Sequence, residues 1–285
     1  MLVGPLEAEY VGNDQCLKAC HEHDQSADNL RLSVHGQQKE SGSGMPLVNC
    51  ETCHGPGSLA VAHAEENKKC DTAQFIQIKE LPAVAQSLLC LKCHSSHSTA
   101  NMQFWSGSRH DLGDISCFGC HKLHAGPEQK IRGEAVNDLC NECHPAVKAS
   151  FSYWSRHPVK EGRMNCSSCH SPHGSLNPLG LKATDMKGLC LECHAEKTGP
   201  YIFEHDDVTD DCSNCHSPHG SPFRGLLRYS EPFLCLQCHT GHTDLENPLT
   251  PSVGYKRGLN TRCTNCHSQI HGTDSTGPSG RALIE

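Results

Sequence analysis

Apolar and aromatic side chains are scarce in this sequence of 285 residues. Aromatic residues make up 5% of the chain, and hydrophobic residues, cysteine included, make up 36%. The 21 cysteines are about 7% of the chain, so the remaining apolar share is about 29%, against roughly 45–50% in globular domains when glycine is counted too. Such a chain cannot bury a large core of its own. Something else must supply buried apolar surface, or the chain stays disordered.

Clustered positive charge is also lacking. The 24 Lys and Arg residues are outnumbered by 32 Asp and Glu, which gives a net charge of −8. No basic run exceeds two residues, and this excludes the clustered basic surface that nucleic-acid binding needs. No apolar run reaches the length of a transmembrane helix. Residues 1–7 lack the charged and apolar regions of a secretory leader.

Cysteine and histidine are abundant instead, and they recur in one motif. The pattern C-x-x-C-H occurs nine times, and a tenth site, C-x-x-x-C-H, has one extra residue. The twenty motif cysteines are Cys16, Cys20, Cys50, Cys53, Cys90, Cys93, Cys117, Cys120, Cys140, Cys143, Cys166, Cys169, Cys190, Cys193, Cys212, Cys215, Cys235, Cys238, Cys263 and Cys266. The ten motif histidines are His21, His54, His94, His121, His144, His170, His194, His216, His239 and His267. Only Cys70 lies outside the motifs.

This recurrence favours covalent haem over zinc or disulfides. Zinc sites and disulfides can use paired cysteines, but neither requires histidine directly after each second cysteine. In c-type haem attachment the two thiols add to the haem vinyl groups, and the next imidazole is the proximal iron ligand. The sequence therefore predicts ten c-type haems. Covalent haem also requires export, so we expect the leader to have been removed.

The first motif leaves two alternatives open. Its extra residue, between Cys16 and Cys20, lengthens the segment that spans the two vinyl groups. Either the segment bulges and both thioethers form, or only Cys20 is bonded and Cys16 stays free. His21 keeps the proximal position in both cases. Cys70 is interpreted as a free or buried thiol.

Twelve histidines outside the motifs can supply the second iron ligands. Several follow a motif histidine by only three or four residues, too close to reach the opposite face of the same haem, so each is expected to ligate a neighbouring one. The predicted distal ligands are His35, His63, His110, His124, His157, His173, His205, His219, His242 and His271. His23 and His97 remain, and His97 competes on pattern alone.

Ten haems in 285 residues would themselves form the core. We therefore expect a multihaem cytochrome c fold: mostly loops with short α-helices around a quasi-linear haem stack, with little or no β-structure. From Cys117 onward a two-motif unit repeats, which is typical of a linear array. We expect two pentahaem halves, residues 1–160 and 161–285, with a soft boundary within one continuous haem array.

Two protein ligands on every iron leave no position for a substrate, so the sequence favours electron transfer over catalysis, and the protein is not expected to be an enzyme. Methionine is scarce, with five residues, and its absence as a ligand predicts low reduction potentials. Multihaem nitrite reductases have a similar haem density, but their C-x-x-C-K site is missing here.

The sequence resembles the decahaem MtrA/DmsE type of c-type cytochromes. The resemblance is clearest from residue 107 to 283, in the segments GSRHD, SRHP, CSSCHSPHGS, CHAEKTGP, EHDDVTDDCSNCHSPHGS and CTNCHSQIHG. The ten distal histidines fall on the family's distal positions, whereas the spacing from Cys16 to Cys20 departs from its pattern.

This resemblance implies an electron conduit at the periplasm and outer membrane, sheathed in a β-barrel porin. Its partners would be that porin, periplasmic electron carriers and an extracellular multihaem cytochrome. Two alternatives remain. The chain could be a subunit of a self-assembling extracellular cytochrome filament, with His23 or His97 ligating a haem of the next subunit, or a multihaem reductase with one haem lacking a distal histidine.

Overall fold

The computed structural model describes residues 4–21, 24–37, 48–95, 102–124, 131–205, 210–240 and 260–283. In these ranges short helices alternate with turns and loops, and no strand forms. Paired β-backbone is limited there to four isolated bridges: Ser155 to Ser221, His170 to Leu181, Phe203 to Thr273 and His216 to Leu227. The predicted fold class is confirmed.

The chain folds as two compact units. Unit 1 comprises residues 1–132 and 172–174, and unit 2 comprises residues 133–171 and 175–285. The two backbone units meet near residue 132. The grouping of the haems into two sets of five stays a prediction.

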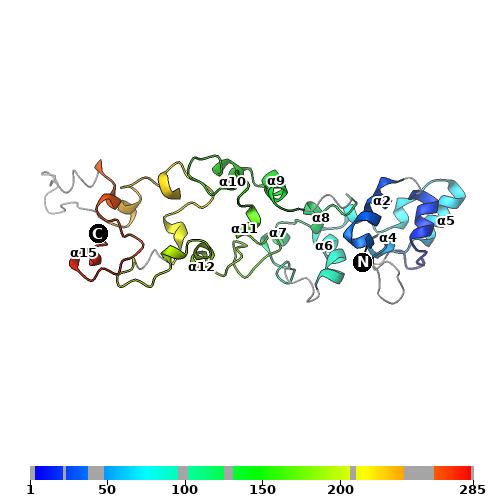
Figure 1. Ribbon diagram of the computed structural model, residues 1–285. Coiled ribbons are helices and arrows are strands. Elements are labelled where there is room, and N and C mark those ends of the chain that lie inside the picture. The colour runs from blue at the N-terminus through cyan, green and yellow to red at the C-terminus, as the bar shows by residue number, and fades with distance from the viewer. Residues whose placement is uncertain are drawn as a thin grey trace. The chain divides into compact units, whose positions relative to one another are not determined.

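Unit 1 contains α6, the longest described helix (Figure 1). Its elements are α1 (Asn13–Cys16), η1 (Leu17–His21), α2 (Gln25–Leu32), α3 (Val34–Gln37), α4 (Cys50–His54), α5 (Ser58–Asn67), η2 (Thr72–Gln74), η3 (Ile78–Glu80), α6 (Ala83–His94), α7 (Arg109–Leu112) and α8 (Cys117–Cys120). Helix α5 packs on η1, α1 on α4, and α6 on α8. Ala60 and Ala64 on α5, Leu89 on α6, and Trp105 are buried. Unit 1 thus has a small apolar core between the motif helices.

Unit 2 consists mainly of single turns joined by loops. Its elements are α9 (Glu134–Cys143), α10 (Pro145–Ser150), α11 (Cys166–Cys169), α12 (Met186–Leu191), η4 (Ala195–Lys197), η5 (Cys212–Asn214), η6 (Arg224–Leu226), η7 (Cys235–Gln237), η8 (Cys263–Asn265) and α15 (Pro278–Arg281). Helix α9 packs on α11, and α12 packs on η5. Among the described residues of unit 2, Leu181 and Pro232 are the buried apolar side chains.

The helices are short throughout the described ranges. The longest, α6, has 12 residues. No described helix combines the length and the apolar character that crossing a bilayer requires.

Side-chain caps start several helices where the sequence provides them. Asn49 and Thr52 form a reciprocal capping box at α4, and Ser108 caps α7. Asp185 accepts the Gly188 N–H at 2.6 Å and starts α12. These caps satisfy helix N–H groups that have no partner within the helix, and so fix where each turn begins.

Candidate haem centres

Seven C-x-x-C-H motifs form the same hydrogen-bonded turn. The backbone N–H of the motif histidine donates to the carbonyl oxygen of the first cysteine at 2.8–3.0 Å. The seven histidines are His121, His144, His170, His194, His216, His239 and His267. The bond spans four residues, as in an α-helix, and holds the two cysteines about one turn apart, as bonding to two vinyl groups of one porphyrin requires.

The first motif absorbs its extra residue in a different kind of turn. Leu17–His21 forms a π-helix, whose hydrogen bonds span five residues and not four. The wider turn winds the additional residue in, so Cys16 and Cys20 remain about one turn apart. The Cys16 thiol contacts Cys50 and the Cys20 thiol contacts Cys70, so both alternatives for this motif stay open.

Seven motif histidines each lie close to a histidine ring from outside the motifs. The ring centroids lie 5.8–6.3 Å apart. The pairs, motif histidine first, are His94 with His35, His54 with His124, His121 with His173, His194 with His157, His170 with His219, His239 with His205, and His216 with His271. Every pair joins a motif histidine to a predicted distal ligand.

This spacing fits a metal ion between the rings. An imidazole nitrogen binds a metal at about 2.0–2.1 Å and its ring centre lies roughly 1 Å further back, so two rings on opposite sides of one ion have centroids about 6 Å apart. By contrast, the described residues include no group of three or more His, Cys, Asp or Glu arranged to hold a metal ion. The residues therefore fit a bis-histidine haem better than a zinc site.

A histidine that closely follows one motif faces the histidine of a different motif, as close sequence spacing requires. His173 follows His170 by three residues but faces His121. His219 follows His216 by three and faces His170. Each such histidine therefore lies beside the motif two before its own.

Hydrogen bonds at Nδ1 orient several of these rings. His157 Nδ1 lies 2.7 Å from the Pro218 carbonyl oxygen, and His216 Nδ1 lies 2.7 Å from that of Gly225. His110, His267 and His63 make the same kind of contact at 2.9, 2.8 and 3.2 Å. A carbonyl only accepts, so Nδ1 carries the proton, and Nε2 keeps the lone pair that a metal needs.

The remaining predicted ligands lie as follows. His63 is on α5 and His110 is on α7. His21 ends the π-helix, with Nδ1 2.8 Å from a carboxylate oxygen of Asp24. His242 lies outside the described residues, as do His23 and His97.

Consecutive motifs lie side by side within each unit. First cysteines interact in four pairs: Cys16 with Cys50, Cys90 with Cys117, Cys190 with Cys212, and Cys235 with Cys263. Second cysteines are close enough for charge on one to raise the pKa of the other in three pairs: Cys53 with Cys93, Cys169 with Cys193, and Cys215 with Cys238. Within each unit, these pairs place motifs that are consecutive in sequence next to one another, as an electron-transfer chain requires.

Two asparagines that sequence reasoning missed link adjacent motifs. Asn13 Oδ1 accepts the Cys50 N–H at 2.9 Å, and Asn137 Oδ1 accepts the Cys166 N–H at 3.0 Å. Each asparagine lies three residues before the first cysteine of its own motif. This shared position was the available signal.

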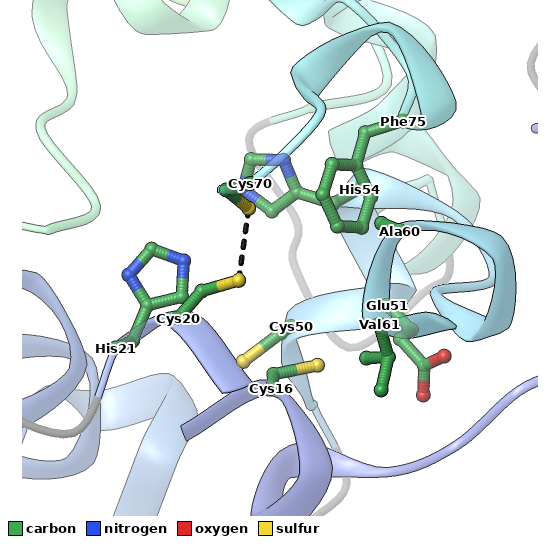
Figure 2. A pocket seen from close by; sticks show the side chains of 10 residues that line it. All are labelled: Cys16, Cys20, His21, Cys50, Glu51, His54, Ala60, Val61, Cys70 and Phe75. Atoms are coloured by element: carbon green, nitrogen blue, oxygen red, sulfur yellow. Dashed lines mark hydrogen bonds between the residues drawn. The ribbon is translucent and has the colours of Figure 1, made fainter. Parts of the chain in front are cut away.

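A cavity of about 70 Å³ lies between the first two motifs (Figure 2). Motif residues line it, His21 and His54 among them, together with Glu51. The Cys70 Sγ is half-buried here, 2.9 Å from the Cys20 Sγ. Burial, followed by the contact with Cys20, raises the pKa of Cys70 to about 11. The leftover thiol thus lies at the first motif.

Comparisons with known proteins agree with this geometry. The doubled CXXCH motif family matches residues 110–149, 157–199 and 205–244. The multiheme cytochrome MtrA of Shewanella baltica is 36% identical over 279 residues, which cover 95% of this chain and 81% of that protein. The C-type polyheme cytochrome OmcB of Geobacter sulfurreducens is 22% identical over 220 residues, 67% of this chain and 26% of that protein.

The similarity to MtrA spans nearly the whole chain, and the repeated motif matches three times within it. Together with the turns that place two cysteines and a histidine side by side, these matches show that the chain belongs to the MtrA family of multihaem c-type cytochromes.

Proposed function

We propose that this chain carries ten c-type haems and conducts electrons across the outer membrane inside a β-barrel porin. It would connect periplasmic carriers with an extracellular multihaem cytochrome. The coarser statement follows from the family: a multihaem cytochrome c is an electron-transfer protein and not an enzyme. The number of haems, the sheath and the partners are the proposal.

The observation that carries the proposal is the set of seven facing histidine pairs. In each, the motif histidine would bind the iron from one side and the facing histidine from the other. The two cysteines of the motif would hold the porphyrin edge through thioethers. A haem bound in this way would supply one-electron chemistry, and the two histidines would leave no position on the iron for another ligand.

We propose the same roles for the three motifs whose histidines are in none of the seven pairs, those of His21, His144 and His267. Each of the ten motifs has its own two cysteines and one histidine. At the first motif the π-helical turn supports bonding through both Cys16 and Cys20. His63, His110 and His242 remain the proposed second ligands that complete the set of ten.

Large apolar side chains on both units support a protein sheath. Leu6 and Leu112 in unit 1 are 86% and 75% exposed, and Leu176 and Phe233 in unit 2 are 73% and 61% exposed. Exposed apolar surface of this kind favours contact with a partner. The resemblance to the MtrA/DmsE type supplies the nature of that partner.

Native purification from membranes tests the conduit. The intact mass of the chain should equal the polypeptide plus ten haems, and native mass spectrometry should find it bound 1:1 to a large β-barrel protein. Recovery as a homopolymer would point to a filament, and recovery as a free monomer to a periplasmic carrier. Either outcome would overturn the porin-sheathed conduit.

The histidine pairing has its own test. His219→Ala should leave one haem of ten high-spin, because the ring that faces His170 is removed. Electron paramagnetic resonance of the oxidised protein measures this, with Ser217→Ala in the same loop as the control. An entirely low-spin spectrum in the His219 variant would contradict the pairing.

A further inference from the structure

Glu51 is a buried carboxylate between the two cysteines of the second motif. Its residue is 2% exposed. One carboxylate oxygen, Oε1, accepts the N–H groups of Val11 and Gly57, both at 2.9 Å, and Oε2 accepts the N–H of Gly12 at 2.8 Å. Three peptide dipoles therefore hold both oxygens in place.

No cation neutralises this carboxylate in the part of the chain that the structure describes. The ion pairs found there involve other acidic residues: Asp24, Asp28, Glu161, Glu196 and Asp210. Burying a charge without a counter-ion is costly, and hydrogen bonds offset only part of that cost. If the only role of this side chain were to accept these hydrogen bonds, a neutral side chain would cost less free energy to bury.

The position of Glu51 is exceptional among the ten motifs. The residue after the first cysteine in the other nine is Leu17, Leu91, Phe118, Asn141, Ser167, Leu191, Ser213, Leu236 or Thr264. None of these is ionisable. Glu142 and Glu192 also lie between the cysteines of their motifs, but both are exposed, so among the described residues a buried carboxylate is a feature of the second motif alone.

The carboxylate lies beside the residues of both N-terminal centres. It lines the same cavity as Cys16 and His21 of the first motif and Cys50 and His54 of the second (Figure 2). Its charge also contributes to raising the pKa of Cys16 and opposes the lowering of the pKa of Cys50. Its field thus reaches the attachment points of two haems.

We propose that Glu51 is a positioning and potential-setting residue, whose fixed negative charge lowers the reduction potentials of the first two haem centres. Reduction adds one negative charge to a centre, and a nearby carboxylate in a poorly solvated site disfavours that addition. The inference rests on the proposed function, because it requires haems at the first two motifs.

Glu51→Gln tests the proposal, since it removes the charge and nearly keeps the size. The full-length protein is first weighed intact, and its reduction is then followed by optical titration against potential. One or two haems of the ten, or about 10–20% of the optical change, should move to higher potential. A titration curve that superimposes on wild type would overturn the proposal.

Two matched variants separate charge at this site from other causes. Ser58→Ala removes the hydrogen bond from the Glu9 N–H to Ser58 Oγ, 2.8 Å, and so loosens the same N-terminal segment without altering charge. Glu65→Gln removes an exposed charge from α5 in the same unit. Both should leave the curve in place. A shift in the Ser58 variant equal to that of Glu51→Gln would assign the effect to packing and overturn the proposal.

A variant of opposite sign covers the case in which Glu51→Gln fails to fold. Val61 is half-buried and lines the same cavity, so Val61→Glu adds a second carboxylate there, with Val61→Gln as its neutral control. The same fraction should now move to lower potential, and the absence of such a shift would overturn the proposal. A wild-type mass with fewer than ten haems would instead count against the proposed function itself.

Discussion

The two units differ in how much of their interior is protein. Unit 1 buries Ala60, Ala64, Leu89 and Trp105, whereas the described part of unit 2 buries only Leu181 and Pro232 among apolar side chains outside the motifs. The difference shows two ways of supporting a haem array. Unit 1 supplements the haem-binding turns with a small helical core, and unit 2 depends almost entirely on the groups that its motifs bind.

The spacing of the motifs explains this difference. The first cysteines of the first four motifs are 34, 40 and 27 residues apart, and those from Cys140 onward are 22–28 apart. The longer intervals have room for α5 and α6, with 10 and 12 residues. Among the shorter intervals, the one before Cys140 still holds α9, with 10 residues, whereas the described helices of the later ones have at most six. Where the motifs are closer together in sequence, fewer residues remain between them to form a buried protein core.

Withholding haem should have the largest effect, and it should separate the units. A chain produced without covalent haem attachment should lose cooperative unfolding, because most of its buried apolar surface would be missing. Residual helix should remain only around α5 and α6. Circular dichroism and limited proteolysis with peptide mapping measure this, and equal protection of fragments from residues 133–285 would contradict the comparison.

Truncating the core of unit 1 should cost less but remain substantial. Leu89→Ala should lower the free energy of unfolding by about 2–4 kcal/mol, because Leu89 is 6% exposed and its removal leaves a cavity. Val84→Ala on the same helix is the control, since Val84 is 59% exposed. Denaturant unfolding of the holoprotein measures both. If the two variants lowered the free energy of unfolding equally, Leu89 would not be part of a buried protein core.

The asparagine links give a comparison between equivalent positions. Asn13→Ala and Asn137→Ala should each lower the free energy of unfolding by about 1 kcal/mol, because each leaves a cysteine N–H without its acceptor. The unit 2 variant should lose more of its resistance to proteolysis, since fewer other contacts support that region. Asp at either position retains an acceptor oxygen and should restore most of the loss. Failure of this rescue would argue against the hydrogen bond.

The smallest effect concerns the cap of α12. The Gly188 N–H, and then the Thr184 hydroxyl, lower the pKa of Asp185 below its usual value of 3.8. The ionised Asp185 carboxylate therefore stabilises the folded chain fully above pH 3.8. This stabilisation is lost as the pH falls through the lower pKa that Asp185 has in the folded state. Asp185→Asn should remove this pH dependence. The difference in melting temperature between wild type and variant, followed from pH 5 downward, should change only in that acidic range.

The sequence alone identified the motif residues, predicted the fold class and limited the candidate distal ligands to the histidines outside the motifs. Close spacing after a motif also predicted that a residue such as His173 serves a motif other than the one it follows. Which motif it serves could not be predicted, because that depends on how the loops fold: His173 faces His121, two motifs earlier, and His54 faces His124, which is 70 residues away. The π-helical turn, and the contacts of Glu51 with residues 11, 12 and 57, likewise depend on tertiary structure.

The facing pairs also imply an order of events in time. When the motifs are numbered along the chain, the described pairs of the even-numbered motifs join a motif histidine to a residue further downstream, as His121 does with His173. Those of the odd-numbered motifs join it to a residue upstream, as His194 does with His157. A chain that leaves the membrane N-terminus first would therefore complete the odd sites at once, while each even site waits for a later segment to arrive.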